Sequence, residues 1–244
     1  MSRRASIVEA TTLARRLSSE ERFVSAKRLL VQSEANARRL GVVLLRLLDP
    51  EREAQWARAA KLARELLYDA DDLVCREAAV TLACLAEDTS TAVSALRHDD
   101  RPGVRLASAL GVGRPRTSSE LAALVELVRD TDVEVRRWAA FFLADAPSLG
   151  AEGEEALLHA LEDDDREVRG EALVGLARAG ICALRVREVL VASLTVDAYD
   201  DWTLEAAGLL RDDSVRRALD ALERALAEAG LVDELENVRV ARQA

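Results

Sequence analysis

The 244-residue sequence has few aromatic residues, only two histidines and four prolines, and no long apolar run. A membrane-spanning helix needs about 20 consecutive apolar residues, and no segment supplies them. Residues 1–10 lack the continuous apolar core of a secretory signal peptide. No segment alternates apolar and polar residues with the period of two that is typical of half-buried strands. These absences predict an all-α protein located in the cytoplasm.

The three cysteines and two histidines offer little for metal binding or nucleophilic catalysis. Cys75, Cys84 and Cys182 lack the spacing of a metal or redox site, and each lies in or beside an apolar helical pattern. We expect buried thiols in a reducing compartment. Neither His98 nor His159 belongs to a recognisable catalytic arrangement. The sequence therefore indicates no catalytic residue, no cofactor and no metal site.

The formal charge of −10 is unevenly distributed along the chain. Residues 1–69 contain 14 basic and 9 acidic side chains, whereas residues 70–244 contain 20 basic and 35 acidic ones. A net acidic surface repels phosphate backbones, which argues against nucleic acid as the partner. The basic N-terminal region has two interpretations. Its arginines, among them Arg15, Arg16, Arg38 and Arg39, either face solvent or dock an acidic partner, including another copy of the chain.

A helical phrase recurs about every thirty residues, which is the most informative pattern in the sequence. The valine of this phrase falls at Val74, Val104, Val135 and Val168, at spacings of 30, 31 and 33 residues. An alanine and a leucine follow four and eight residues after three of these valines, whereas Leu110 and Val112 follow Val104. Self-similarity at this period is typical of a stacked helical solenoid, in which one repeat cannot bury its apolar face alone.

The pattern predicts an α-solenoid of about seven antiparallel helix pairs that occupies residues 1–244 as one domain. Residues 1–69 would be basic capping repeats, 70–195 the well-marked repeats and 196–244 a degenerate capping repeat. The expected first helices of the marked repeats are 72–85, 101–113, 133–145 and 166–178, and the second helices are 89–97, 118–129, 152–162 and 184–194. Two earlier helix pairs are also expected. The first consists of helices at 5–17 and 20–32, and the second of helices at 34–48 and 51–68. A weaker copy contains Trp202, followed by helices at 213–229 and 231–244.

Charged residues recur at fixed places in this repeat and are interpreted as structural. An Asp just before a helix can accept hydrogen bonds from free backbone amides at the helix start. An Arg at one repeat position can reach the neighbouring repeat's Asp, which would form a ladder along the stack. The expected ladder residues are Asp71, Asp132, Asp165, Arg105, Arg136 and Arg169.

The phrase Asp-x-x-Val-Arg-x-x-Ala-x-x-x-Leu-(Ala/Gly) over residues 71–195 resembles HEAT repeats, specifically the short variety also found in phycobilin lyases. The resemblance implies a scaffold in which the second helices of the pairs line a concave, partner-binding surface. Side chains three and four apart share a helix face. On this basis the candidate protein-binding residues are Glu126, Arg129, Glu155, His159 and Glu162; the alternative is a solvated helix face.

Three enzymatic alternatives follow from the same resemblance. Deoxyhypusine hydroxylase requires repeated His-Glu pairs, which this sequence lacks. Alkylpurine DNA glycosylases use tryptophans and an aspartate. Trp138 and Trp202, with Asp145 and Asp201 nearby in sequence, are the candidates, but both tryptophans fit the repeat pattern and are expected in the core. A phycobilin lyase would handle a bilin chromophore, yet no residue here marks that chemistry.

The sequence therefore predicts a non-catalytic scaffold or adaptor that binds another protein on the solenoid surface. The acidic body favours a basic partner, because charge complementarity steers association. An immunity or inhibitor protein that masks a basic enzyme is the first alternative, and the enzymatic readings are the others. The partner's identity and the oligomeric state stay open.

Overall fold

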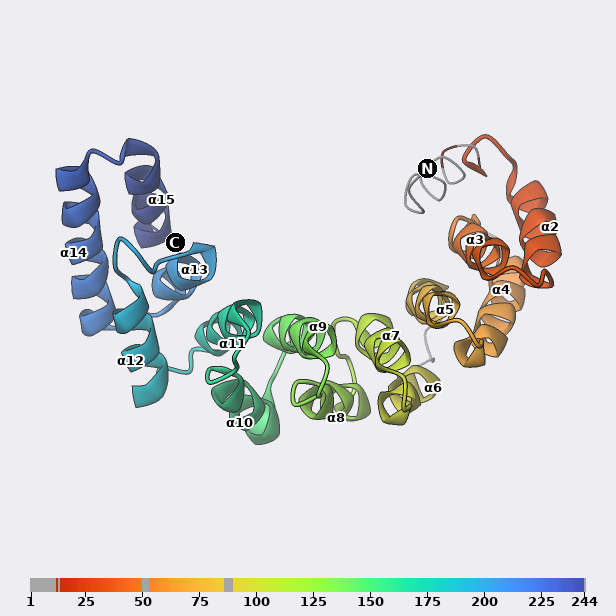
Figure 1. The fold of residues 1–244 in the computed structure, drawn as a ribbon, viewed down its shortest axis with the longest axis horizontal. Helices are drawn as coiled ribbons and strands as arrows, with labels where there is room; N and C mark the ends of the chain where they lie inside the picture. Colours follow the sequence, from red (N-terminus) through yellow and green to blue (C-terminus); the bar gives the residue numbers. More distant parts are fainter. Residues whose placement is uncertain (1–11, 13, 50–52, 86–89, 244) are drawn as a thin grey trace. The chain divides into compact units, whose positions relative to one another are not determined.

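The repeated helical phrase produces a chain of α-helices joined by short turns in the computed structural model, which describes residues 12, 14–49, 53–85 and 90–243. Within these ranges there is no β-strand, and the chain divides into two compact units, residues 1–113 and 114–244. Figure 1 shows the helices in chain order. The all-α solenoid expected from the sequence is confirmed. The part of the first predicted helix within residues 5–11, together with Pro50, lies outside the described residues.

The first unit contains helices that pack in sequence order, α3 against α5 and α5 against α7. Short 3-10 turns at Leu66–Tyr68 and Leu96–His98 end two of the pairs. Pro102 occupies the first turn of α7, where its missing N–H costs no hydrogen bond. The helices are α2 (Ser19–Leu30), α3 (Ala35–Arg46), α4 (Glu53–Glu65), α5 (Asp72–Leu85), α6 (Ser90–Ala95) and α7 (Pro102–Val112).

The second unit arranges its helices in two layers, with α9, α11 and α13 in one and α8, α10 and α12 in the other (Figure 1). The helices of the first layer make the more extensive contacts, α9 with α11 and α11 with α13. The long α14 packs against α12 and α15. The helices are α8 (Ser118–Leu127), α9 (Val133–Ala144), α10 (Gly150–Ala160), α11 (Arg166–Arg178), α12 (Leu184–Ser193), α13 (Asp201–Leu209), α14 (Asp213–Ala229) and α15 (Val232–Gln243).

The core of each marked repeat consists of the valine, alanine and leucine that define the phrase. Val135, Ala139 and Leu143 are fully buried on α9, and their counterparts on α11 are equally buried. Spacings of four residues put these side chains on one helix face, which packs into the stack. Small residues also bring helices close together. A Cβ added at Gly175 of α11 would lie 2.7 Å from the Cα of Ala144 in α9.

Several burial expectations are corrected by the structure. Trp138 is 38% exposed, because its side chain does not belong to the buried face of α9 that carries Ala139. Cys75 is buried, but Cys84 on the same helix is exposed and Cys182 is half-buried. Burial raises the pKa of the Cys75 thiol to about 12. Its Sγ donates a hydrogen bond to the carbonyl of Leu67 over 2.8 Å.

Two of the N-terminal arginines neither face solvent nor offer a free docking surface. Arg38 donates to Asp69 over 2.8 Å, and Arg39 to Glu77 over 2.9 Å. Both arginine side chains are less than one-fifth exposed. Arg15 and Arg16 are exposed, which is compatible with both interpretations.

No helix in the described part of the chain combines the length and the apolarity that crossing a bilayer requires.

Candidate protein-binding surface

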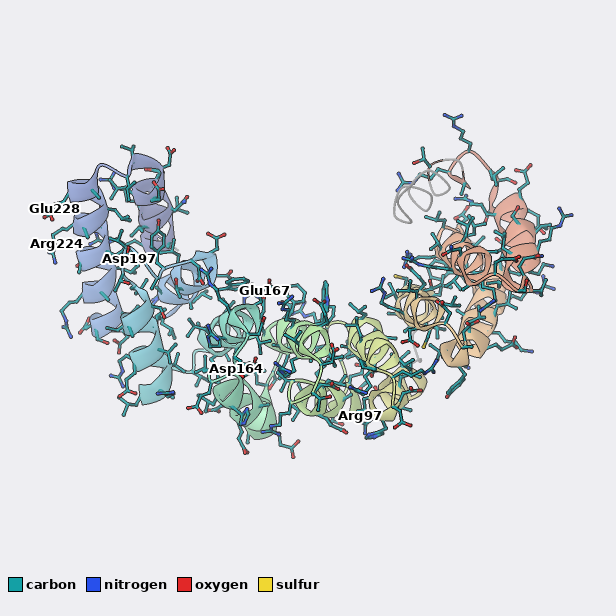
Figure 2. The ribbon with its side chains drawn as sticks, viewed as in Figure 1. Arg97, Asp164, Glu167, Asp197, Arg224 and Glu228 are labelled. Carbon is teal, nitrogen blue, oxygen red and sulfur yellow. The ribbon has the colours of Figure 1, made fainter. Side chains whose placement is uncertain are left out.

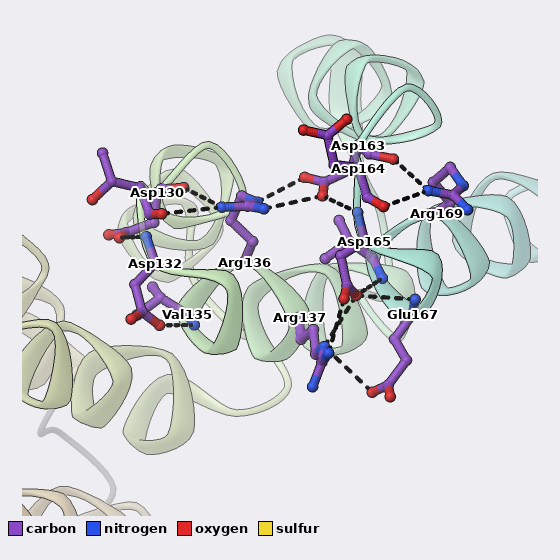
Figure 3. A network of polar contacts seen from close by, with 12 residues as sticks. Asp130, Asp132, Val135, Arg136, Arg137, Asp163, Asp164, Asp165, Glu167 and Arg169 are labelled. Carbon is purple, nitrogen blue, oxygen red and sulfur yellow. Dashed lines mark hydrogen bonds and ion pairs between the residues drawn. The ribbon is translucent and has the colours of Figure 1, made fainter.

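The turns between repeats are built around pairs of aspartates two residues apart (Figure 3). Asp132 is the N-cap of α9 and accepts from the backbone amides of Glu134 and Val135 at 3.0 and 3.2 Å. Asp130, two residues earlier, accepts from the amide of Asp132 at 2.8 Å. Asp163 and Asp165 repeat this arrangement before α11. These carboxylates thus accept hydrogen bonds from the backbone amides that have no partner within the helix at its start.

Arg136 connects one such turn to the next. Its Nε and Nη2 donate to the two carboxylate oxygens of Asp163 at 2.7 and 3.1 Å, a bidentate contact between repeats. Its Nη1 also donates to the carbonyls of Asp130 and Thr131 in its own turn. The Asp163 hydrogen bond is the main reason why the pKa of Arg136 is raised. Arg136 and Asp163 are largely buried, so this contact belongs to the stack and not to a free surface.

Arg137 makes a second contact between the same repeats. It donates to both oxygens of Asp165 at 3.0 and 2.8 Å and to Glu134 at 3.1 Å, and its Nε lies 3.5 Å from Glu167. The hydrogen bond from Arg137 is the main cause that lowers the pKa of Asp165 to about 2. One guanidinium therefore serves three carboxylates, which leaves an excess of negative charge beside it.

The other expected ladder residues occupy equivalent turns. Asp71 accepts from the amides of Leu73 and Val74. Arg105 donates to the carbonyls of Asp99 and Asp100. Arg169 donates to the carbonyls of Asp163 and Asp164 at 2.6 and 2.9 Å. In the described structure Arg169 has no carboxylate partner in the following repeat.

The residues predicted to bind a partner lie in the α8 and α10 layer and are exposed. Arg129 follows α8, and its Nη2 lies 3.9 Å from Glu155 of α10. Glu162, just after α10, accepts from Arg185 at 2.9 Å. Glu126 and His159 are near the ends of their helices. The layer stays a predicted binding face.

An aromatic cluster lies on α9, in the other layer of the second unit. Trp138, Phe141 and Phe142 contact one another with ring centroids 5.2–5.7 Å apart. Trp138 and Phe141 are 38% and 44% exposed. Three of the eight aromatic residues of the chain thus gather on one helix. Exposed aromatic clusters of this kind are typical of interaction sites, because they leave apolar area in water.

Between α9 and α11 the cluster borders a groove of about 260 Å³, which we call the α9–α11 groove. Figure 2 shows Glu167 on α11, at the side of the helix away from α10. Arg137 lines the groove and is bound by the carboxylates described above. The lining residues are Glu134, Arg137, Trp138, Phe141, Glu167 and Glu171.

The next repeat extends this face onto α13. The cap of α13 is Asp200, which places Thr203, and not Trp202, at the position of the repeat valine. Trp202 instead points back to α11, where its indole Nε1 donates to Glu171 at 3.0 Å. The absence of a side chain at Gly170 leaves space for the indole ring, since a Cβ there would lie 2.5 Å from Trp202. Burial raises the pKa of Glu171, and the Trp202 hydrogen bond opposes that effect.

The charge of the second unit matches the charge of its groove. Residues 114–244 contain 28 acidic and 16 basic side chains, a net charge of −12. Within the groove, three glutamates surround the single Arg137, whose guanidinium is already bound by Asp165. The α9–α11 groove is therefore an acidic depression with an aromatic wall.

Sequence reasoning missed this groove because it assigned Trp138 to the core. The available signal was the spacing of Trp138, Phe141 and Phe142. In α9 the buried residues are Val135, Ala139 and Leu143, and a side chain one residue before Ala139 points about 100° away from it. The large aromatic residues at positions 138 and 141 therefore could have been placed outside the apolar stripe.

The comparisons with known proteins identify the repeats. The family model of HEAT repeats matches residues 121–211. YibA of Escherichia coli is 30% identical over 124 residues, in strain K12 and in O157:H7 alike. That match covers 51% of this chain and 44% of YibA, so the chain spans less than half the length of the curated relatives it matches.

The structural neighbours have the same fold. The X-ray structure of E. coli YibA aligns with a TM-score of 0.76 at 22% identity, over 96% of this chain and 84% of YibA. An archaeal HEAT-like repeats protein from Thermococcus onnurineus NA1 aligns with a TM-score of 0.55 at 14% identity, over 87% of this chain and 93% of that protein. Residues 121–211 therefore match HEAT repeats, as the recurring phrase predicts, and the chain shares the fold of these helical-repeat structures.

Proposed function

We propose that this HEAT-repeat chain is a non-catalytic scaffold that binds a basic protein partner through its second unit. The observation that supports this most directly is the acidic groove with its exposed aromatic wall on α9. Aromatic residues that stay exposed in a folded unit supply binding energy when a partner covers them. The surrounding carboxylates favour a positively charged partner over a negatively charged one.

The distribution of the other charged groups supports the same function. The aspartates of the turns and Arg136 are engaged in capping and in the contact between repeats. These residues hold the stack together and are not available to a partner. The groove, in contrast, keeps more carboxylates than it has cations. A surface of this charge attracts a basic protein and repels nucleic acid.

Affinity capture with the full-length chain tests the proposal. The tagged protein is incubated with lysate of the organism that encodes it, at low and at high salt, and bound material is identified by mass spectrometry. We expect a basic protein in stoichiometric amount that is lost as salt rises, because screening shortens the range of the attraction. A control capture on resin that carries no tagged chain identifies the proteins that bind the matrix itself.

Three results would contradict the proposal. The first is a partner that is acidic, and the second is binding that salt leaves unchanged. The third is recovery of pigment or nucleic acid without any protein, which would favour the enzymatic readings.

A further inference from the structure

We infer that the α9–α11 groove is a receptor for an arginine side chain from a basic segment of the partner, with the guanidinium stacked on Trp138. This inference rests on the proposed function and specifies which group the partner contributes. It requires a cation site, a flat aromatic face and limited space, and the groove has all three.

The cation site comes from the glutamates of the groove. Glu134 and Glu167 stand at its rim, and both are more than half exposed. Glu171 lies deeper and is half-buried, with Trp202 donating to one of its oxygens. Arg137 carries one positive charge and shares it among Asp165, at 2.8–3.0 Å, Glu134 and Glu167. The carboxylates that line the groove therefore outnumber its cation, and the excess negative charge attracts a second one.

The aromatic wall decides which cation fits. Trp138 is supported from behind by Phe142, whose ring is 28° from parallel with a centroid separation of 5.7 Å. This contact holds the indole, of which 38% stays exposed and can be covered by a ligand. A planar guanidinium stacks on an indole face and can donate to a carboxylate in the same plane, whereas an ammonium is a compact, strongly hydrated charge. The geometry favours arginine over lysine.

The size of the groove limits what can enter. Pockets that bury drug-sized ligands are typically about 300–1,000 Å³. At about 260 Å³ the α9–α11 groove suits one long side chain and excludes a helix. The remainder of the partner would lie over the outer surface of α9 and α11, where Phe141 is 44% exposed.

The indole N–H signals of the full-length chain in two-dimensional NMR provide the test. The chain has three tryptophans: Trp138 lines the groove, Trp202 donates to the groove residue Glu171, and Trp56 lies in the first unit. The probe is a short glycine–serine peptide that contains two arginines, compared with peptides in which lysine or the neutral isostere citrulline replaces arginine. A Trp138→Phe variant assigns the Trp138 signal.

We expect the arginine peptide to shift the Trp138 signal saturably and more tightly than the lysine peptide. The citrulline peptide and the Trp56 signal should show no response. If the citrulline peptide acts like the arginine peptide, if Trp56 shifts equally, or if no signal moves at millimolar peptide, the inference is wrong.

A pair of matched double variants locates the binding. Glu134→Gln/Glu167→Gln removes two carboxylates from the groove, and Glu155→Gln/Glu162→Gln removes two exposed, arginine-paired carboxylates from the other layer. The first should weaken the arginine peptide by roughly three- to tenfold. Trp138→Leu should weaken it by roughly two- to fivefold. The second double variant should bind like the parent.

The outcomes separate this inference from the proposed function. Capture of a basic partner that is equally strong with both double variants would refute the groove as the receptor and leave the scaffold function in place. Loss of capture in the α10-layer variant alone would assign binding to that layer. Absence of any basic partner, together with silent NMR titrations, would overturn both. Circular dichroism of each variant verifies that the helices are intact.

Discussion

At the scale of single residues, Arg136 and Arg137 show how neighbours in sequence serve different carboxylates. Successive side chains on a helix point about 100° apart, so the two arginines leave α9 in different directions. Arg136 reaches Asp163 in the turn before α11, and Arg137 reaches Asp165 at the cap itself. Together they fix two consecutive repeats at two points (Figure 3).

Replacing Arg136 by alanine should destabilise the second unit by about 1–3 kcal/mol, because Asp163 would lose a bidentate, charge-assisted partner while staying largely buried. Urea unfolding followed by circular dichroism measures the change. Arg216→Ala is the control. Arg216 and its partner Asp213 are both well exposed, so this substitution should change the free energy of unfolding by no more than about 0.5 kcal/mol. Equal midpoints for the two variants would show that the contact between repeats adds no stability.

The two cysteines of α5 should differ strongly in reactivity. Cys75 is buried with a pKa of about 12, so almost no thiolate forms at neutral pH, whereas Cys84 is exposed. Alkylation with iodoacetamide at pH 8, analysed by peptide mass spectrometry, should modify Cys84 first and leave Cys75 unmodified until the unit unfolds. Comparable rates at the two sites would contradict the burial of Cys75.

Sequence patterns predicted the residues with local roles better than those with surface roles. An Asp ahead of an apolar helical stretch has a local reason to be there, and Asp132 and Asp165 do start α9 and α11. The exposure of Trp138 depends on the packing of α9 against α11. A count of repeat positions cannot measure that packing. The role of Asp163 likewise has no local signal in the sequence, because its partner Arg136 is 27 residues away.

At the scale of elements, the start of α11 depends on the ionised form of Asp165. Its pKa is lowered to about 2, below the value of about 3.9 for an unfolded Asp. A lowered folded-state pKa stabilises the fold above the unfolded value, and the stabilisation is lost as the pH falls toward the folded value. The affected window runs from about pH 4 down to about pH 2.

Arg137→Ala removes the main cause of this shift, so its effect should depend on pH. We expect Arg137→Ala to be less stable than the parent at pH 7, with the difference narrowing between pH 4 and pH 2 as Asp165 takes up a proton in both proteins. Unfolding midpoints measured across this range provide the test. A difference that stays constant down to pH 2 would mean that Arg137 acts by packing and not through Asp165.

The close approach of α9 and α11 depends on Gly175. Gly175→Ala would put a methyl group 2.7 Å from the Cα of Ala144, a backbone atom that cannot rotate away, and should cost about 1–3 kcal/mol. Gly153→Ala on α10 is the matched control, because its nearest atoms belong to the Leu149 side chain at 3.2 Å. There the gain in helix propensity of about 1 kcal/mol offsets most of the strain. Thermal unfolding that ranks Gly153→Ala as the more harmful change would refute the tight contact.

At the scale of the whole molecule, the fold could be predicted from the period of the repeat because each unit of the pattern contacts mainly its neighbours. The predicted helix at 166–178 coincides with α11, and the one at 213–229 with α14. The binding surface could not be predicted in this way. Both layers of a helix pair carry exposed charges, and the layer with the α9–α11 groove is distinguished only by aromatic residues whose exposure is a tertiary property.

Charge and salt should govern how the chain meets its partner. With a net charge of −12 on the second unit, association with a basic protein is steered electrostatically and slows as salt rises. The dissociation rate should change less with salt, because it depends on the contacts in the groove.

The most direct test of binding through the α9–α11 groove is the affinity of the captured partner for the parent chain and for the two double glutamine variants, measured by calorimetry at one salt concentration. We predict that Glu134→Gln/Glu167→Gln weakens the partner by roughly three- to tenfold, whereas Glu155→Gln/Glu162→Gln leaves its affinity unchanged. Equal affinities for all three proteins, or weakening only by the α10-layer pair, would contradict binding through the groove.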